Sequence, residues 1–334
     1  MDLVGGWTTH GPGQGFFVSE VEAASAGARV FAAGSEAAHD SAIYRSDDGG
    51  STWQRISDSP GPDFIDVLAV DPRDPDRLFV TTIHAGFSGF TTRLFRSVDG
   101  GVSWSLRQSQ FGFASTAEIV FDPTDPRIVY VAWHSLASVQ RSIDGGETFT
   151  DFPAPFSADV LAAAPDGSLV AGSDRSIFVS HDRAQSWSAA APAPFQCPVR
   201  SLAIDANDSR RWFVGTGRNE YPCGEVFRTE DGGGTWTLVE DLAGPVDDIA
   251  LDAFHAGVLY AAIGPADSTV FVGRVLASSD GGETWIDLRL PITPGAYALS
   301  LGERGSRLHA ATAAGVWERS FRWPTSLSPR GRQP

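Results

Sequence analysis

An eight-residue pattern recurs six times along this chain and constrains its fold more than any other feature. The pattern is Ser/Thr-x-Asp-x-Gly-x-Ser/Thr-aromatic, as in "SDDGGSTW" at residues 46–53. In the fourth copy, "SHDRAQSW", Ala184 replaces the second glycine. Six copies of one short pattern indicate a repeat protein rather than six active sites. The pattern aspartates are Asp48, Asp99, Asp144, Asp182, Asp231 and Asp280.

The spacing of the pattern indicates the repeating unit. Successive pattern aspartates lie about 38 to 51 residues apart. Before most copies comes a segment such as "LAVDPRDPDRLFVTT" at 68–82, which predicts strand, turn and strand because β-branched and aromatic runs flank turn formers. A short apolar stretch then leads into the pattern. Each unit therefore holds four short strands, A to D from the inside outward, and predicts one blade of a β-propeller.

Seven blades are predicted although the pattern occurs six times. Residues 297–320 match strands A, B and C of a further blade, and "GGWTTHGP" at 5–12 resembles the end of a pattern copy, with Trp7 in the aromatic position. Pairing these segments would remove the exposed edges of an open sheet. The predicted fold is all-β, a single seven-bladed β-propeller of four-stranded blades over residues 1–323, with the ring closed by the N-terminal strand. Residues 324–334 are predicted to be a disordered tail.

The repeats resemble those of the Asp-box, or bacterial neuraminidase repeat, superfamily over residues 5–320. That superfamily includes sialidases, sortilin-like receptor domains, tandem-propeller xyloglucanases and the photosystem II assembly-factor family. The resemblance implies the propeller fold but no single function, because this scaffold serves enzymes and binding proteins alike. The resemblance also shows which family active sites this chain does not match. Sialidases use three arginines, whereas only Arg200 falls in the predicted funnel, and the xyloglucanases place catalytic carboxylates between two propellers, whereas one is predicted here.

The pattern aspartates are expected to be structural. Each carboxylate can accept backbone N–H groups within its own turn, and the glycines can adopt positive φ. The aromatic residue can be buried between neighbouring blades. A calcium loop of the helix–loop–helix kind needs alternating acids and a distal Glu, which the pattern lacks. The seven histidines are scattered, so neither a metal site nor a cofactor is predicted.

Charge and cysteine content bound the partners and the compartment. A net charge of −16 argues against nucleic acid as the partner. No apolar run is long enough to predict a membrane span. The first residues lack the regions of a signal peptide, so a cytoplasmic protein and an exported one without its signal both stay open. Cys197 and Cys223 fall on the same face of blade 5, so either a disulfide, which would favour a secreted or periplasmic protein, or two free thiols is possible. A monomer is expected.

The D–A and B–C loops should open on one face, opposite the pattern turns. Long B–C loops are predicted at 84–93, 217–225 and 264–273, and Tyr221 in the second is a candidate ligand contact. His84 and His134 follow the B strands of blades 2 and 3 and should reach the same face. The start of strand A should point into a central funnel, and aligning the blades gives a funnel ring of Ser19, Asp66, Ala117, Asp159, Arg200, Asp247 and Tyr297.

The funnel ring supports two interpretations. Three carboxylates at one mouth can have their pKa values driven apart, as catalysis requires. Alternatively, Arg200 can lie between Asp159 and Asp247 in a structural ion network. We expect a non-catalytic module that binds a protein or glycan through its loop-rich face. The alternative is a single-propeller carbohydrate-active enzyme, hydrolase or lyase, that uses funnel carboxylates about 5–10 Å apart; a binder should instead present exposed aromatic residues.

Overall fold

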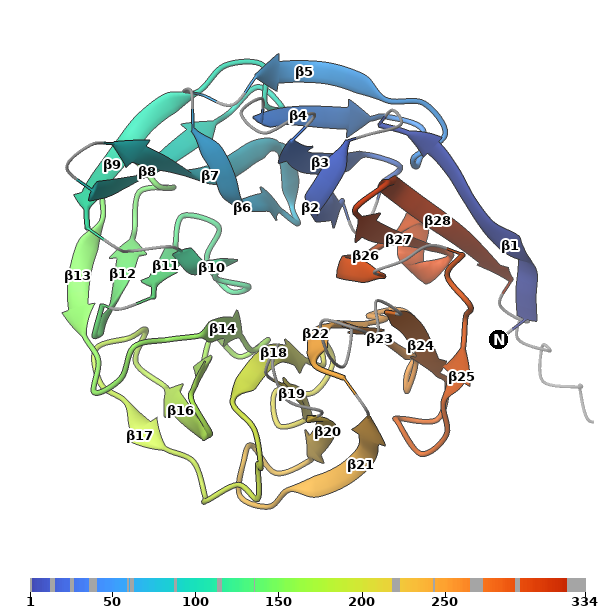
Figure 1. Cartoon of the computed structure of the whole chain (residues 1–334). Helices are drawn as coiled ribbons and strands as arrows, with labels where there is room; N and C mark the ends of the chain where they lie inside the picture. Colours follow the sequence, from blue (N-terminus) through green and yellow to red (C-terminus); the bar gives the residue numbers. More distant parts are fainter. Residues whose placement is uncertain are drawn as a thin grey trace, which may run out of the picture.

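Seven four-stranded antiparallel sheets surround one axis in the computed structural model (Figure 1). The structure describes residues 2–12, 16–24, 27–35, 41–58, 60, 63–86, 89–112, 116–134, 136–217, 223–242, 244–264, 273–291 and 295–322. The predicted all-β, seven-bladed propeller is confirmed. The predicted tail at 324–334 lies outside the described residues.

Each blade runs from an inner strand A to an outer strand D. Blade 1 contains β2 (Phe17–Ala23), β3 (Val30–Ser35), β4 (Ser41–Ser46) and β5 (Gln54–Asp58). Blade 2 contains β6 (Phe64–Asp71), β7 (Asp74–Gly86), β8 (Gly89–Ser97) and β9 (Ser105–Phe111). Blade 3 contains β10 (Thr116–Phe121), β11 (Val129–Trp133), β12 (Ser138–Ser142) and β13 (Thr150–Pro153). Blade 4 contains β14 (Val160–Ala163), β15 (Leu169–Ser173), β16 (Ser176–Ser180) and β17 (Ser188–Ala189).

The remaining three blades follow the same order. Blade 5 contains β18 (Val199–Ile204), β19 (Trp212–Thr216), β20 (Gly224–Thr229) and β21 (Thr237–Leu242). Blade 6 contains β22 (Val246–Leu251), β23 (Leu259–Ile263), β24 (Arg274–Ser278) and β25 (Ile286–Asp287). Blade 7 contains β26 (Ala296–Gly302), the 3-10 turn η1 (Glu303–Gly305), β27 (Arg307–Thr312) and β28 (Gly315–Arg322), with β1 (Asp2–Gly11) as its outer strand.

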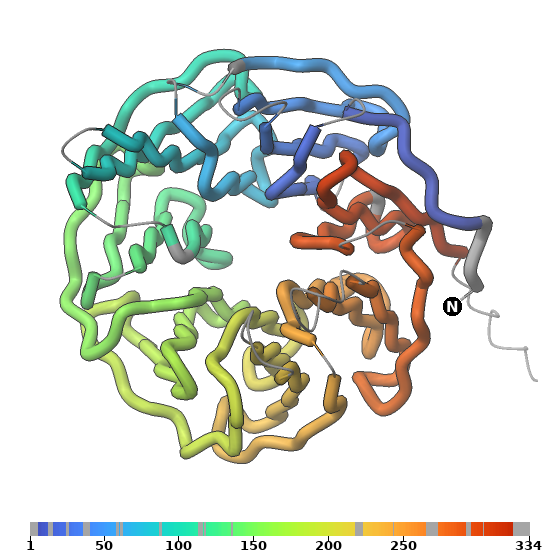
Figure 2. The backbone as a smooth tube through the Cα atoms, in the orientation of Figure 1, coloured from blue at the N-terminus to red at the C-terminus, as the bar shows by residue number. Residues whose placement is uncertain are grey.

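The N-terminal strand closes the ring, as predicted. β1 pairs antiparallel with β28, from Asp2 opposite Arg322 to Gly11 opposite Val316. Figure 2 shows this as the blue start of the tube lying along the red last blade. The indole of Trp7 is buried between blades 6 and 7, where its Nε1 donates a hydrogen bond to the carbonyl oxygen of Leu288 at 2.8 Å. A hydrogen-bonded indole and a paired strand therefore join the first residues to the last blade.

The hydrophobic core is divided among the junctions between blades. Seven buried clusters occur, and each combines residues of two adjacent blades. Between blades 2 and 3, for example, Phe79 packs with Val131 and Trp133. Because apolar surface is removed from water at every junction, each blade depends on both of its neighbours.

Each copy of the repeated pattern forms the turn between strands C and D, here called a pattern turn. In blade 1, the Asp48 carboxylate accepts hydrogen bonds from the N–H and the hydroxyl of Thr52, at 2.7 and 2.6 Å. The Ser46 hydroxyl in turn accepts the N–H of Gly50 at 2.8 Å. The other five pattern aspartates accept the same pair of bonds from the Ser or Thr four residues later.

Arginines fasten pattern turns to the preceding blade. Arg228 Nη1 of blade 5 donates to the carbonyl oxygen of Gly281, in the pattern turn of blade 6, at 2.6 Å. Arg307 Nη1 of blade 7 donates to Gly49 in the pattern turn of blade 1, also at 2.6 Å. The pattern turns therefore help to hold neighbouring blades together.

Candidate functional site

The funnel-ring positions coincide with β-bulges in the inner strands. In blade 2, Ile65 pairs with Thr82 and Val67 with Thr81, so Asp66 is an extra, unpaired residue. A bulge turns its side chain away from the regular alternation of the strand and is a frequent feature next to binding sites. The bulge found at Asp66 also occurs at Ser19, Ala117, Arg200, Asp247 and Tyr297. Asp159 differs, because it directly precedes β14 and its strand pairs without a register shift.

The structure pairs Arg200 with Asp247, at 2.5 Å between Nε and Oδ1. The prediction that Arg200 lies between Asp159 and Asp247 is therefore correct for Asp247 and wrong for Asp159. Asp159 instead accepts the N–H of Asp174 at 2.8 Å and lies 3.6 Å from Nδ1 of His134. Register explains the difference, because Arg200 and Asp247 occupy bulges of adjacent blades whereas Asp159 directly precedes the unbulged strand β14.

The ring carboxyl groups differ in acidity, and burial rather than mutual repulsion is the main reason. Burial raises the pKa of Asp66, although the N–H of Thr116 donates to its carboxylate at 2.6 Å. Burial also raises the pKa of Asp247, and the guanidinium of Arg200 offsets only part of this. Burial acts in the same direction on Asp159, but its contacts with His134 and the Asp174 N–H outweigh it and lower the pKa.

Four further carboxyl groups, missed from the sequence, converge near the axis. Glu20, Glu118 and Asp248 each follow a bulge directly, on β2, β10 and β22, and Glu22 lies two residues beyond Glu20. All four are half-buried. Burial, with added repulsion from neighbouring members of the group, raises the pKa of Glu22 and of Glu118 to about 8. We call these four residues the axial carboxyl cluster.

The pKa shifts show that members of the axial carboxyl cluster from different blades affect one another. Burial raises the pKa of Asp248 to about 6, even though its carboxylate accepts the N–H of Leu299 at 2.7 Å. The charge of Asp248 affects both Glu22 and Glu118, which belong to blades 1 and 3. Carboxyl groups from distant parts of the sequence thus share one poorly solvated region. A polar residue directly after the ring position, within an apolar strand, was the available sequence signal.

His84 is held by a carboxylate that the sequence did not reveal. Asp63 is buried and lies 2.8 Å from Nδ1 of His84 and 2.7 Å from Nη1 of Arg93. The Thr82 hydroxyl donates to the same carboxylate at 3.1 Å. These contacts fix the imidazole on the B–C side of blade 2.

Aromatic residues lie in or beside the funnel ring on blades 7, 1 and 2: the half-buried Tyr297 and the exposed Phe17 and Phe64. Phe17 and Phe64 occupy the same position, two residues before the ring residues of β2 and β6, and are 40% and 44% exposed. The ring of Phe17 contacts that of Tyr297, with 5.2 Å between centroids. The charged ring residues Asp159, Arg200 and Asp247 lie on blades 4, 5 and 6, and Asp66 lies beside Phe64 on blade 2, so aromatic and charged side chains share the mouth. The candidate contact Tyr221 lies outside the described residues.

Cys197 and Cys223 form a disulfide in blade 5, with 6.4 Å between their Cα atoms. It links the segment before strand A to the segment before strand C. Within the described ranges, no three His, Cys, Asp or Glu side chains are grouped so as to hold a metal ion. No helix of the described part is long and apolar enough to cross a membrane.

Two groups of known proteins are similar to this chain. A xyloglucanase from Paenibacillus sp. is 26% identical over 294 residues, which make up 72% of this chain but only 28% of that enzyme. A second xyloglucanase, from Hypocrea jecorina, is 26% identical over 267 residues, again 28% of its length. The chain therefore spans little more than a quarter of these relatives. No protein-family model matches it.

Solved structures support the same fold. YCF48 bound to D1 peptide superposes with a TM-score of 0.68 at 15% identity, covering 96% of this chain and 98% of YCF48. The GH74 enzyme of Niastella koreensis gives a TM-score of 0.56 at 16% identity, covering 88% of this chain and 62% of the enzyme. The chain is thus a seven-bladed β-propeller similar to YCF48 along its whole length and to part of the GH74 xyloglucanases.

Proposed function

We propose that this protein is a non-catalytic binding module that recognises a protein or a glycan through its loop-rich face. The observation that carries the proposal is the combination of aromatic and charged residues at the mouth of the propeller. Phe17, Phe64 and Tyr297 offer aromatic surface among the charged residues of the funnel ring. Aromatic anchors surrounded by polar groups are typical of recognition surfaces for peptides and sugars.

The state of the funnel carboxylates favours binding over catalysis. A glycosidase needs one carboxyl group as acid and a second, free carboxylate as base or nucleophile. Asp247 is engaged by Arg200, and Asp159 by the N–H of Asp174 and by His134. Both are therefore held as hydrogen-bond acceptors, a role that suits ligand positioning.

The comparisons support this proposal through coverage. The similarity to YCF48, solved with a bound peptide, extends over nearly all of both chains. The matched xyloglucanases extend far beyond the region that this chain resembles. The disulfide of blade 5 supports a secreted or periplasmic location, because such bonds persist in oxidising compartments. We further propose that the module acts as a monomer.

A carbohydrate-active enzyme is the second candidate, and the xyloglucanase similarity favours it specifically. Asp66 would be its acid, since burial raises the pKa of this carboxyl group. The catalytic version predicts turnover of a polysaccharide such as xyloglucan by the isolated chain. It also predicts that Asp66→Asn abolishes this turnover.

Parallel peptide and glycan arrays, followed by titration of the hits, test the proposal. Phe64→Ala should weaken binding at least about tenfold, or about 1.4 kcal/mol. Phe254→Ala is the matched control, because Phe254 is 49% exposed in the A–B turn of blade 6, on the opposite face. Release of reducing sugar from xyloglucan, lost in Asp66→Asn, would instead establish the enzyme. Equal binding by Phe64→Ala and Phe254→Ala would refute the proposal that the loop-rich face binds the ligand.

A further inference from the structure

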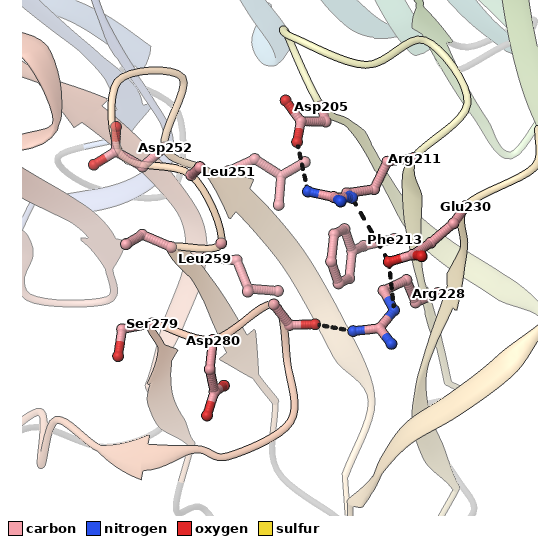
Figure 3. Close-up of a pocket in the computed structure, with 14 residues that line it drawn as sticks. Asp205, Arg211, Phe213, Arg228, Glu230, Leu251, Asp252, Leu259, Ser279 and Asp280 are labelled. Carbon is pink, nitrogen blue, oxygen red and sulfur yellow. Dashed lines mark hydrogen bonds and ion pairs between the residues drawn. The ribbon is translucent and has the colours of Figure 1, made fainter.

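A cavity of about 330 Å³ lies between blades 5 and 6, on the face that carries the pattern turns (Figure 3). This volume corresponds to roughly ten water molecules and falls in the range of small-molecule sites. Its walls come from strands β19, β20, β22 and β23 and from the A–B turns and pattern turns of blades 5 and 6. The loop-rich face, to which the proposed function belongs, is at the other end of the blades.

At two other junctions, an arginine at or just before strand B contacts the next blade, whereas its equivalent at this junction contacts its own blade. Between blades 1 and 2, Arg29 pairs with Asp76 of β7 at 2.5 Å. Between blades 2 and 3, Arg77 Nη2 donates to the carbonyl oxygen of Pro126 in the next A–B turn at 2.5 Å. Arg211 is the equivalent residue of blade 5, but its ion pairs are with Asp205 and Glu230 of its own blade.

The facing turn of blade 6 is also small. Ala256 and Gly257 stand where blade 3 has Pro126 and Arg127. Gly257 adopts a φ of 79°, and its carbonyl oxygen accepts the N–H of Gly281 at 2.8 Å. This contact fixes the A–B turn against the pattern turn, so the cavity has rigid walls.

One wall of the cavity is polar, and its hydrogen-bonding capacity is not filled. Arg211 lies 3.5 Å from Asp205 and 3.8 Å from Glu230, both longer than a good hydrogen bond between ions. Arg228 lies 3.5 Å from the same Glu230, and its Nη1 and Nη2 donate to the carbonyl oxygen of Gly281 and to Glu283, at 2.6 and 2.9 Å. The long contacts of Arg211 therefore leave its guanidinium as the donor of this wall that a ligand can use. Donors and acceptors therefore alternate along this wall, as the chain of dashed contacts in Figure 3 shows.

The opposite wall is apolar, with Leu251 and Leu259 beside the edge of Phe213. The lining holds two guanidinium groups and the four carboxylates of Asp205, Glu230, Asp252 and Asp280. Those of Asp252 and Asp280 already accept hydrogen bonds within their own turns, so the carboxylates left to balance the two arginines are those of Asp205 and Glu230. The carboxylates of Asp252 and Asp280 nearby disfavour an anion, and the two arginines disfavour a cation. A neutral ligand with several hydroxyl groups and one apolar face would satisfy both walls.

We propose that the cavity between blades 5 and 6 binds an uncharged, hydroxyl-rich ligand the size of one sugar residue. Arg211 donates to ligand hydroxyl oxygens, and Asp205 and Glu230 accept from ligand hydroxyl groups. The C–H face of the ligand packs on Leu251 and Leu259.

Saturation-transfer NMR and calorimetry on the full chain test this, with the methyl glycosides of glucose, galactose and xylose as probes. At least one should bind with a Kd of the order of 1 mM. Glucosamine and glucuronate, tested beside them, should bind more weakly because each carries a charge. Ala256→Trp should fill the cavity and weaken binding at least about tenfold. Ala253→Trp is the matched control, since Ala253 is exposed in the same turn but does not line the cavity.

Arg211→Met provides a second test that keeps the size of the side chain, in case Ala256→Trp perturbs the turn. It should weaken binding to a similar extent, and Phe64→Ala, tested beside it, reports any sugar bound on the loop-rich face. Loss of binding in Phe64→Ala with retention in both cavity variants would place the sugar on the loop-rich face and overturn the proposal. Absence of saturable binding by all three methyl glycosides would overturn it as well.

Discussion

Ser97 and Asp99 stabilise the same pattern turn in different surroundings. The buried hydroxyl of Ser97 accepts the N–H of Gly101 at 2.9 Å, and the exposed carboxylate of Asp99 accepts the N–H of Ser103 at 2.9 Å. A buried donor left unpaired costs its full desolvation, whereas water can replace the partner of an exposed one.

We therefore expect Ser97→Ala to lower the free energy of unfolding by about 2 kcal/mol and Asp99→Ala by about 1 kcal/mol. Urea denaturation measures both, with Val98→Ala as the control because Val98 is exposed in the same turn. Neither change should affect ligand binding by the folded protein. A larger loss for Asp99→Ala than for Ser97→Ala would contradict this account.

The pattern aspartates were predictable and the axial carboxyl cluster was not, for a physical reason. The partners of Asp48 lie within four residues, so the sequence already contains the whole interaction. The acidity of Glu118 depends on Asp248, from another blade, and on bulges that leave no residue signature of their own. The same holds for Asp63, whose partners His84 and Arg93 lie on the next two strands.

The axial carboxyl cluster should make stability fall at alkaline pH. The pKa of Glu118 is about 8 in the folded protein, against 4.5 as its ordinary value. Between these values the folded state holds a proton that the unfolded state has lost, so the free energy of unfolding falls as the pH rises. The stabilisation is complete below about pH 4.5 and is lost as the pH passes 8.

Glu118→Gln should remove the part of this proton dependence that Glu118 contributes, leaving that of Glu22, and raise stability above that of the wild type at pH 8.5, by roughly 1–2 kcal/mol. Thermal unfolding between pH 5 and 8.5 measures the effect. Glu283→Gln, which removes an exposed carboxylate from the pattern turn of blade 6, should leave the pH profile unchanged in shape. Stability–pH profiles of the same shape for wild type and Glu118→Gln would contradict the conclusion that these carboxyl groups share one poorly solvated region.

At the scale of elements, strand β1 is the clearest test of ring closure. Deleting residues 1–12 would leave β28 as an open edge and remove the buried Trp7. We expect the free energy of unfolding to fall by at least about 3–5 kcal/mol, the cost of removing a buried tryptophan side chain. Thermal unfolding measures it, and Trp7→Phe is the milder control because it keeps the strand. An unchanged Tm after the deletion would refute the role of β1.

The disulfide of blade 5 should stabilise the two segments that it joins. Cys197 and Cys223 are 26 residues apart, and closing a loop of that length contributes about 3 kcal/mol in the chain-entropy model. Oxidised protein should therefore unfold at higher denaturant concentration than reduced protein. The variant with both cysteines replaced by serine should match the reduced form. Two titratable thiols in denatured, non-reduced protein would exclude the bond.

The strands themselves were largely predictable, because alternating apolar runs and turn formers recur in every blade. The matching of residues 297–320 with 5–12 predicted even the composite seventh blade. The bulges at the funnel ring were not predictable, since they depend on how each inner strand pairs with its neighbour. The bulges decide which side chains face the axis. The partners of Asp159 and Asp247 therefore could not be predicted from the sequence.

At the scale of the whole molecule, each junction between blades is a separate unit of stability and of specialisation. Six pattern turns share one geometry, yet the junction of blades 5 and 6 encloses a cavity where Arg29 and Arg77 contact the next blade at the junctions of blades 1–2 and 2–3. The repeat predicts what the blades share. The differences that make a site arise from single residues, such as Ala256 and Gly257, that only the packed ring places opposite Arg211.

The pairing of β1 with β28 also fixes how the ring should respond to a pulling force. Asp2 lies opposite Arg322, so tension between these residues loads the outermost hydrogen bonds first and peels the strands apart. Tension between Gly11 and Arg322, at opposite ends of the ladder, loads all its bonds together in shear. Optical-tweezer measurements should therefore record a markedly lower rupture force for the first pair of attachment points. The ring should therefore open at low force when it is pulled at Asp2 and Arg322, and resist when it is pulled at Gly11 and Arg322.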